Sequence, residues 1–294
     1  MAENTAESTR TTPGAPDHAP DRAPGRVPRR GAGRAPGTGP DQAQDHGAHP
    51  APTPGPATAP GRERAALAVW APQFRLRLTT PGLELRVPDE SDLRALAELV
   101  ADQGIHAPDA APFQGGWSNA LPQVVAGRVL QYLWKGLALS RPDYWNLGLA
   151  VFLDGRPVGV QGLQARRFPT LGEIATESWL ARGHQGRGIG TEMRAAALRL
   201  AFEGLGARYA TSAVFEDGAA ALAVNKKLGY RQDGIEIQER KGEPVVLTRW
   251  RMTRAQWEPG PAADVPTTLH GLDGCRALFG ARPHDTPTAR REPA

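Results

Sequence analysis

The sequence is poor in cysteine, since Cys275 is the only one among 294 residues. A single thiol excludes an intrachain disulfide, which suits a reducing compartment. Long apolar runs are also missing, and none approaches the roughly 20 residues that a membrane-spanning helix needs. We therefore expect a cytoplasmic protein without a membrane partner.

Groups of metal-ligand residues at typical spacing are lacking too, and spacing alone proposes no Ser-His-Asp set. Charges are nearly balanced, with 35 Lys and Arg against 31 Asp and Glu and a net charge of +4. The central part of the chain has no block of basic residues, which a nucleic-acid-binding face would require. We expect neither a metal nor a nucleic-acid partner.

Large apolar residues are almost absent from residues 1–61, which are rich in Pro, Ala and Gly. Such a segment cannot bury enough surface to offset the entropy of ordering it, so we expect it to be disordered. Residues 258–294 have a similar but weaker composition, and we expect a flexible C-terminal tail there. Residues 70–257 remain as one domain of ordinary size, either monomeric or homodimeric.

The first half of this domain predicts two strands, two helices and a long loop. Residues 73–78 and 83–87 alternate apolar and polar side chains around a Thr-Thr-Pro-Gly turn, as half-buried strands do. A helix start at 88–92 leads into an apolar face that ends near Gly104. The loop 104–121 is long enough to indicate a functional segment, and with the helix expected over 122–139 it would shape a substrate site.

The second half predicts strands at 145–153, 158–164, 173–180, 208–215, 230–238 and 245–252, with helices after residues 190 and 217. From residue 83 on, the order is strand, two helices, three antiparallel strands, helix, strand, helix and two strands. This is an α+β pattern, with one mixed and mostly antiparallel central sheet flanked by helices on both faces.

A glycine-rich turn lies between the strand 173–180 and the helix that follows it. Residues 181–190 read Ala-Arg-Gly-His-Gln-Gly-Arg-Gly-Ile-Gly, and Ile189, Met193, Ala197 and Leu200 then recur at helical spacing. Glycines let a ligand approach the backbone, and a helix start offers unpaired N–H groups and a positive dipole end. The combination favours phosphate binding.

Three kinds of phosphate loop compete for this turn. A P-loop needs Lys-Ser/Thr after its last glycine, but Thr191-Glu192 follows here. A dinucleotide fingerprint that starts at Gly186 would need a glycine at position 191. The third pattern, Gln/Arg-x-x-Gly-x-Gly/Ala, fits Gln185 to Gly190.

Two further motifs accompany the loop: Trp179-Leu180 before it, and Lys227-Leu-Gly-Tyr230 about forty residues after it. With these motifs and the element order, the chain resembles the GNAT superfamily of N-acetyltransferases over about residues 83–254. The closer resemblance is to the branch that includes ribosomal-protein N-terminal acetyltransferases. The resemblance implies a GNAT fold with splayed strands, here 174–180 and 208–215, that hold acyl-CoA.

The same resemblance implies which residues hold acetyl-CoA, the expected co-substrate. The pantetheine arm would run along the backbone of Trp179 and Leu180. The pyrophosphate would lie on the loop amides, where an N–H nest and a helix dipole suit an anion. The cofactor-binding set is therefore Trp179, Leu180, Gln185, Gly186, Arg187, Gly188, Ile189, Gly190 and Thr191. We expect Lys226 and Lys227 to face solvent rather than the 3′-phosphate.

Transfer to an amine needs a base, because most amines are protonated at neutral pH. Our candidate is Glu177, in an otherwise apolar strand where burial would raise its pKa. Glu173 has the same side-chain parity and would point into the same cleft, while a backbone N–H near Trp179 or Leu180 would serve the oxyanion. The alternative is that both carboxylates face solvent on the outer side of the strand.

The acid for the leaving thiolate is where the chain departs from the family. Many members have tyrosine where Asn225 stands, and the closer branch often has Asn-x-x-Ser where Gly218 and Ala221 stand. Ser178, Ser212, Tyr230 or water remain as donors. Alternatively, the thiolate leaves without a dedicated acid, or activity is reduced.

Three other residues invite a functional interpretation that we do not adopt. His184 precedes the glycine motif, but a histidine in such a loop is more often exposed or hydrogen-bonded than catalytic. Tyr132 and Trp134 would line a substrate pocket, but at helical spacing the core is the better expectation.

Two hypotheses from different classes follow. The first is an acetyl-CoA-dependent N-acetyltransferase that acts by direct transfer to a peptide N-terminus or a small amine. The second, motivated by Gly218, Ala221 and Asn225, is a GNAT-like acyl-CoA-binding module with weak or no catalysis.

Overall fold

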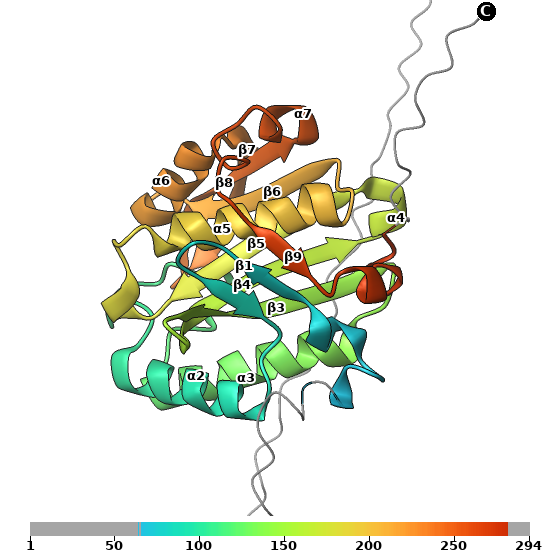
Figure 1. Ribbon diagram of the computed structural model, residues 1–294. Coiled ribbons are helices and arrows are strands. Elements are labelled where there is room, and N and C mark those ends of the chain that lie inside the picture. The colour runs from blue at the N-terminus through green and yellow to red at the C-terminus, as the bar shows by residue number, and fades with distance from the viewer. Residues whose placement is uncertain (1–63, 65, 282–294) are drawn as a thin grey trace, which may run out of the picture. The chain divides into compact units, whose positions relative to one another are not determined.

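The computed structural model describes residue 64 and residues 66–281 (Figure 1). The disorder expected for residues 1–61 lies outside these described residues. The helices are α2 (Glu90–Gln103), α3 (Pro122–Leu139), α4 (Phe168–Leu171), α5 (Ile189–Arg199), α6 (Ala219–Leu228) and α7 (Arg254–Trp257). The strands are β1 (Arg77–Thr79), β2 (Glu84–Arg86), β3 (Tyr144–Leu153), β4 (Arg156–Arg166), β5 (Glu173–Leu180), β6 (Tyr209–Phe215), β7 (Arg231–Arg240), β8 (Glu243–Thr253) and β9 (Thr268–His270).

Across the described residues, nine strands form one sheet in the order β7-β8-β6-β5-β4-β3-β2-β1-β9. Neighbouring strands are antiparallel except β5 and β6, which are parallel. Helices α2 and α3 lie on one face of the sheet and α5 on the other (Figure 1). The predicted α+β class, with a mostly antiparallel sheet covered on both faces, is confirmed.

Each face of the sheet carries its own apolar cluster. On the side of α2 and α3, Leu96, Val100 and Val129 pack with Phe152 and Trp179. The cluster on the side of α5 is larger and includes that helix's Met193 and alanines. These two clusters bury the faces that the helical and strand periodicities predicted.

Local chemistry fixes both ends of α2. The Asp89 side chain accepts a hydrogen bond from the Asp92 amide, and the Asp92 side chain accepts one from the Asp89 amide, which makes a capping box. At the other end Gly104 has a φ of +66°, a value that favours glycine, and α2 ends at the residue before it. The predicted start and end of this helix are therefore confirmed.

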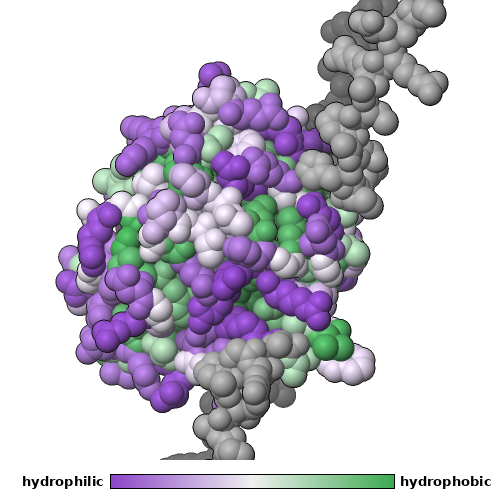
Figure 2. Space-filling model, in the orientation of Figure 1, coloured by the Kyte–Doolittle hydropathy of each residue, from purple (hydrophilic) through white to green (hydrophobic). Residues whose placement is uncertain are grey.

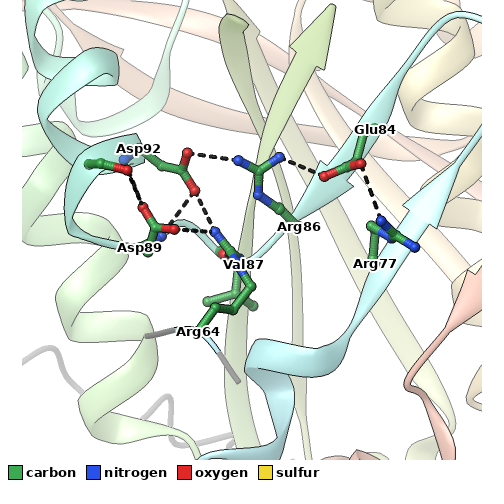
Figure 3. A network of polar contacts seen from close by, with 8 residues as sticks. Arg64, Arg77, Glu84, Arg86, Val87, Asp89 and Asp92 are labelled. Carbon is green, nitrogen blue, oxygen red and sulfur yellow. Dashed lines mark hydrogen bonds and ion pairs between the residues drawn. The ribbon is translucent and has the colours of Figure 1, made fainter. Parts of the chain in front are cut away.

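A chain of charged side chains joins the start of α2 to strands β1 and β2 (Figure 3). Arg64 contacts the carboxylates of Asp89 at 2.7 Å and Asp92 at 2.6 Å. Arg86 bridges Asp92 at 2.8 Å and Glu84 at 2.6 Å, and its guanidinium lies 3.6 Å from the centre of the Phe152 ring. The network holds the short strands β1 and β2 against the helix that follows them.

The first predicted strand is shorter than expected. Residues 73–75 belong to a 3₁₀ turn, Pro72–Arg75, and only Arg77–Thr79 pair as β1. Proline fixes φ near −65° and lacks an N–H, so it favours the first position of a helical turn over an extended strand. The alternating pattern alone did not reveal this.

The expectation of a flexible tail from residue 258 is wrong for residues 258–281. Strand β9 pairs antiparallel with β1, and Cys275 and Phe279 are fully buried. The Phe279 ring meets Trp145 edge-on at 5.0 Å, and the Trp145 indole N–H donates to the Phe279 carbonyl at 3.0 Å. The few apolar residues of this segment are ordered because they cover apolar surface that the rest of the sheet leaves open.

The face that carries α5, β1 and β9 is a mosaic dominated by hydrophilic residues, with hydrophobic atoms exposed in small separate areas (Figure 2). Scattered exposed apolar residues of this kind are normal for a protein surface. Among the described helices, none is long and apolar enough to cross a membrane.

Candidate active site

The two parallel strands β5 and β6 separate partway along their length. They pair at Glu173–Tyr209, Ile174–Ala210 and Ala175–Thr211, and the backbone ladder stops there. On its other side β5 stays paired with β4 as far as Leu180. Residues 176–180 therefore have one backbone edge that makes no ladder with β6, as predicted for the splayed strands.

Successive side chains of β5 point to opposite faces of the sheet. Glu177 and Trp179 lie on the face of α2 and α3, where Trp179 joins the apolar cluster. Thr176 and Ser178 lie on the face of α5, where both bond Arg194. The candidates Glu177 and Ser178 are thus adjacent in sequence but on opposite faces.

On the α3 face, Glu177 has one specific partner. The Tyr132 hydroxyl of α3 donates a hydrogen bond to Glu177 Oε1 at 2.7 Å, and it lies 3.0 Å from Asn146 Oδ1. Burial raises the pKa of Tyr132 well above its usual 10.0, and the charge and hydrogen bond of Glu177 raise it further. Tyr132 is therefore a stable O–H donor to the carboxylate near neutral pH.

Two glycines make room for this contact. Gly148 of β3 pairs with Gly162 of β4, and Gly162 pairs with Glu177. A Cβ on Gly162 would lie 2.5 Å from the Tyr132 hydroxyl oxygen and 2.8 Å from Glu177 Cγ. A Cβ on Gly148 would lie 2.5 Å from Leu133, the neighbour of Tyr132. The row Gly148-Gly162-Glu177 lets α3 approach the sheet closely enough to reach the carboxylate.

The expected burial of Glu177 is wrong, because its side chain is exposed. The residue lies on the unpaired stretch of β5, where no strand covers its outer edge. An exposed carboxylate is instead open to exchange protons with a substrate or through water.

Glu173 does not share a site with Glu177. Its carboxylate accepts a hydrogen bond from Arg251 of β8 at 2.5 Å, and Arg251 also contacts Asp233 at 2.7 Å. Glu173 stands at the end of β5 that is still paired with β6. The expectation that both carboxylates point into one cleft is therefore wrong, since Glu173 belongs to an ion-pair cluster.

On the α5 face, a second polar cluster surrounds Arg194. Its guanidinium donates to Gln161 Oε1 at 3.3 Å, Thr176 Oγ1 at 3.1 Å and Ser178 Oγ at 2.8 Å. Thr176 also donates to the Thr211 carbonyl of β6 at 2.9 Å, so a side chain bridges the two strands where their ladder stops. Sequence reasoning assigned Arg194 no role, although an arginine among the alanines of a buried helix face could have indicated one.

Tyr230 lies in the same cluster and is almost fully buried. Its hydroxyl is 3.1 Å from Thr176 Oγ1. Burial raises the pKa of Tyr230, although the nearby Arg194 charge opposes the shift. Of the hydroxyls considered as proton donors, Tyr230 and Ser212 are buried, and Ser178 is the one that is half-exposed.

The glycine loop has the geometry of an anion site. Gly186 and Gly188 have φ of +72° and +84°, and a Cβ on either would meet nothing within 4 Å. Among the described residues, no acceptor bonds the amides of residues 186–190, whereas those of Thr191 and Glu192 bond the Gly188 carbonyl. Open space and unpaired donors at the start of α5 fit a phosphate group.

One predicted loop residue, Gln185, has other partners. The Gln185 side chain donates to the carbonyls of Ile105 and Leu180, both at 2.8 Å, so it holds the loop against β5. The Leu180 carbonyl is consequently occupied. Arg187 is exposed at the tip of the loop and available to an anion. Lys226 and Lys227 are exposed, as expected.

Asn225, at the position where many family members have tyrosine, is buried against β6. Its Nδ2 lies 3.3 Å from Ser212 Oγ, while its buried Oδ1 has no partner among the described residues. Since the amide is planar, turning it over would leave Nδ2 unpaired instead. One polar atom of Asn225 thus has no partner among the described residues in either orientation.

The β7–β8 hairpin closes over the loop 104–121. Gln238 donates to Gln114 at 3.2 Å, and Lys241 donates to the Asp109 carbonyl at 2.7 Å.

On α3, Trp134 is 52% exposed, so the expectation that it belongs to the core is wrong. Tyr132 is half-buried and joins Glu177, a partner that helical spacing alone could not identify.

Across the described residues, no group of three or more His, Cys, Asp or Glu side chains is placed to hold a metal ion. The His184 ring nitrogen Nδ1 is buried without a partner, and the residue is half-buried beside the loop.

Comparisons with known proteins agree with this geometry. A family model described as an acetyltransferase (GNAT) domain matches residues 82–231. Among solved structures, Mycobacterium smegmatis RimJ in complex with a CoA disulfide is 21% identical, with a TM-score of 0.52 over 63% of this chain and 90% of that one. A GCN5-related N-acetyltransferase from Brucella melitensis is 17% identical, with a TM-score of 0.50 over 62% of this chain and 80% of that one.

A third structure, RimL, described as a ribosomal L7/L12 alpha-N-protein acetyltransferase in complex with coenzyme A, is 18% identical. Its TM-score is 0.48 over 59% of this chain and 95% of that one. At these identities the likeness concerns the fold.

Proposed function

The chain belongs to the GNAT acetyltransferase family, and from this premise we propose that it transfers the acetyl group of acetyl-CoA directly to an amine. The acceptor is a peptide or protein N-terminus or a small amine. The family match covers the splayed strands, the glycine loop and α5, which are the parts that an acyl-CoA donor needs.

The acyl-CoA site is supported by three features of the described chain. The amides of Gly186 to Gly190 lack acceptors and suit a pyrophosphate, with Arg187 beside them. The unpaired edge of residues 176–180 suits the pantetheine arm, including the backbone of Trp179. The free amide atom of Asn225 suits a polar group on that arm. Gln185 positions the loop, and Thr191 lies in the first turn of α5.

The observation that carries the catalytic proposal is the hydrogen bond from Tyr132 to Glu177 on the unpaired stretch of β5. Glu177 accepts a proton from the amine, directly or through one water, and Tyr132 positions the carboxylate. The amine nitrogen forms a bond to the acyl carbon, the thioester C–S bond breaks, and CoA leaves as a thiolate. A correctly placed base contributes about 10²–10⁴-fold to such a rate.

For the proton that the thiolate takes, we place Ser178 and solvent water ahead of Ser212 and Tyr230. Ser178 is half-exposed, and its oxygen accepts from Arg194, so its own O–H remains available to donate. Tyr230 is buried, with its hydroxyl against Thr176. Glu173 has no part in the reaction because Arg251 holds it.

The experiment mixes the protein and acetyl-CoA with a panel of peptide N-termini and small amines, and measures release of CoA thiol and the acetylated product. Calorimetric titration with acetyl-CoA runs beside it. Binding with turnover supports the proposal. Binding without turnover against every acceptor would favour the acyl-CoA-binding module, which Gly218, Ala221 and Asn225 motivate. No binding would contradict both.

A further inference from the structure

Arg194 is a buried cation without a negative partner. The residue is 6% exposed and lies in the second turn of α5. In the described part of the chain, no carboxylate lies within salt-bridge distance of it, and its side-chain hydrogen-bond partners are all neutral: Gln161, Thr176, Ser178 and Tyr230. Buried arginines are normally paired with an anion.

The positive charge of Arg194 in a buried position needs an explanation. Arginine stays protonated in proteins, and removing its charge from water is unfavourable unless a counter-charge compensates. The neutral hydrogen bonds orient the guanidinium but do not neutralise it. Gln161, Thr176 and Ser178 occupy three of its five N–H groups, and the Tyr230 hydroxyl is a further neutral hydrogen-bond partner, so at least one N–H is left over. The side chain is therefore held in place with capacity left for an anion.

The accessible edge of this cluster lies on the unpaired stretch of β5. The bonds of Arg194 to Gln161 and Thr176 are buried, whereas the bond from Nη2 to Ser178 is only partly buried. Ser178 is half-exposed and lies three residues beyond the last pair of the β5–β6 ladder. An anion would therefore reach Nη2 and the Ser178 hydroxyl from the space between the splayed strands.

We propose that the acyl-donor site accepts, in addition to acetyl, a short acyl group whose far end is a carboxylate, and that Arg194 and Ser178 bind this carboxylate. The inference rests on the proposed acyl-CoA function. A guanidinium matches a carboxylate in shape and charge, and the Ser178 O–H adds one more donor.

The carboxylate belongs to the donor rather than to the acceptor because of the faces of β5. Glu177, which receives the amine proton, points to the α3 face with Tyr132. Arg194 and Ser178 lie on the opposite face, under α5. The glycine loop at the start of α5 holds the donor's phosphates, so the donor arm runs on the side of the same helix. The pyrophosphate itself is served by the loop amides.

The bonds that form and break are the same as in acetyl transfer. The amine nitrogen bonds to the acyl carbon, the C–S bond breaks, and the amine proton passes to Glu177. CoA leaves as a thiolate and is protonated by water. The product is an amide that ends in a carboxylate.

The test is a calorimetric comparison, without acceptor, of acetyl-CoA, butyryl-CoA and succinyl-CoA. The last two have acyl chains of equal length and differ in the terminal carboxylate. We expect succinyl-CoA to bind about tenfold more tightly than butyryl-CoA, as one charge-assisted contact would give. In Arg194→Met the preference should disappear, and Arg194→Lys should retain part of it. Arg94→Met, at an exposed arginine of α2, is the matched control and should leave the preference intact.

Equal or weaker binding of succinyl-CoA than of butyryl-CoA by the unaltered protein would overturn the inference. This measurement does not depend on the folding of any variant. If acetyl-CoA still binds and turns over, the proposed function stands while the inference fails. If no acyl-CoA binds, the proposed function fails and the inference with it. A preference that survives in Arg194→Met would also overturn the assignment, because another residue would then bind the carboxylate.

Discussion

The hydroxyl of Tyr132 lies 2.7 Å from Oε1 of Glu177 and joins helix α3 to the unpaired stretch of strand β5. The two residues are 45 positions apart in the sequence. Their contact depends on the paired glycines Gly148 and Gly162, which leave no side chain between the helix and the sheet. A base, its positioning hydroxyl and the space for both therefore come from four separate elements.

Replacing Glu177 by glutamine should remove the proposed base while keeping its size. We expect kcat/KM for acetyl transfer to fall by about 10²–10⁴-fold, because a placed base contributes that much. Acetyl-CoA affinity should hardly change. Glu173→Gln is the matched control on the same strand and face, and it should leave kcat/KM nearly intact because Glu173 pairs with Arg251. Equal losses in both variants would contradict the assignment.

Gly162→Ala should disturb the same contact through packing. The new Cβ would lie 2.5 Å from the Tyr132 hydroxyl oxygen. We expect a loss of about 1–3 kcal/mol of unfolding free energy, as overpacking gives, together with reduced transfer. Denaturant unfolding measures the first effect. The control is Gly127→Ala on the exposed side of α3, where a Cβ meets nothing within 4 Å; it should stabilise by about 0.5–1 kcal/mol.

Gly188→Ala should weaken acyl-CoA binding through the backbone. Gly188 has a φ of +84° at the start of α5, and no atom lies within 4 Å of an added Cβ. The left-handed conformation costs a residue with a Cβ about 1–2 kcal/mol. We expect calorimetric affinity for acetyl-CoA to fall by about tenfold as the loop amides move. Gly274→Ala has the same open surroundings without the positive φ and should leave affinity unchanged.

Much of the fold followed from periodicity and from turn residues. The helix 90–103 could be predicted because Asp89 and Asp92 form a capping box and Gly104 ends the helix. The glycine loop was recognisable because its spacing reflects backbone conformations that few other residues adopt. Helix caps and glycine turns depend on residues that are close together in the sequence, so they can be recognised there.

What could not be predicted depends on contacts between distant parts of the chain. Nothing near Tyr132 in the sequence indicates that its hydroxyl reaches Glu177. Nothing near Glu173 shows that Arg251 holds it. We expected the segment 258–281 to be flexible because it contains few apolar residues. Its composition does not show that Phe279 packs on Trp145, which is far away in the sequence. Arg194 was overlooked although its alanine-rich surroundings mark a buried helix face.

Tyrosine ionisation offers a test of the surroundings of Tyr132 and Tyr230. Burial raises the pKa of Tyr132 and of Tyr230. Because the folded chain holds these protons more tightly than the unfolded chain, their contribution to stability is full below about pH 10 and falls as pH rises through the raised values. Tyrosinate absorbance of the native protein should therefore remain incomplete where the urea-unfolded chain is fully ionised. Tyr132→Phe and Tyr230→Phe should each remove one late-titrating group.

Cys275 reports on the packing of the C-terminal segment. Burial raises the pKa of its thiol to about 11, and Sγ lies 3.2 Å from the Leu272 carbonyl. At about pH 8 roughly a thousandth of the thiol is ionised, and the thiolate is the form that reacts. We expect a thiol reagent to label the native protein far more slowly than the unfolded chain. Since the sequence has no other cysteine, the signal comes from one site.

Phe279→Ala should raise that labelling rate by loosening the segment around Cys275. The substitution removes the ring that packs on Trp145, a change that costs about 3–5 kcal/mol in a buried site. Local opening then exposes the thiol more often than global unfolding does. Leu171→Ala is the control, because Leu171 is 51% exposed and its loss should leave labelling slow. Rapid labelling of the unaltered protein, at the rate of the unfolded chain, would show that residues 258–281 are not held on the sheet.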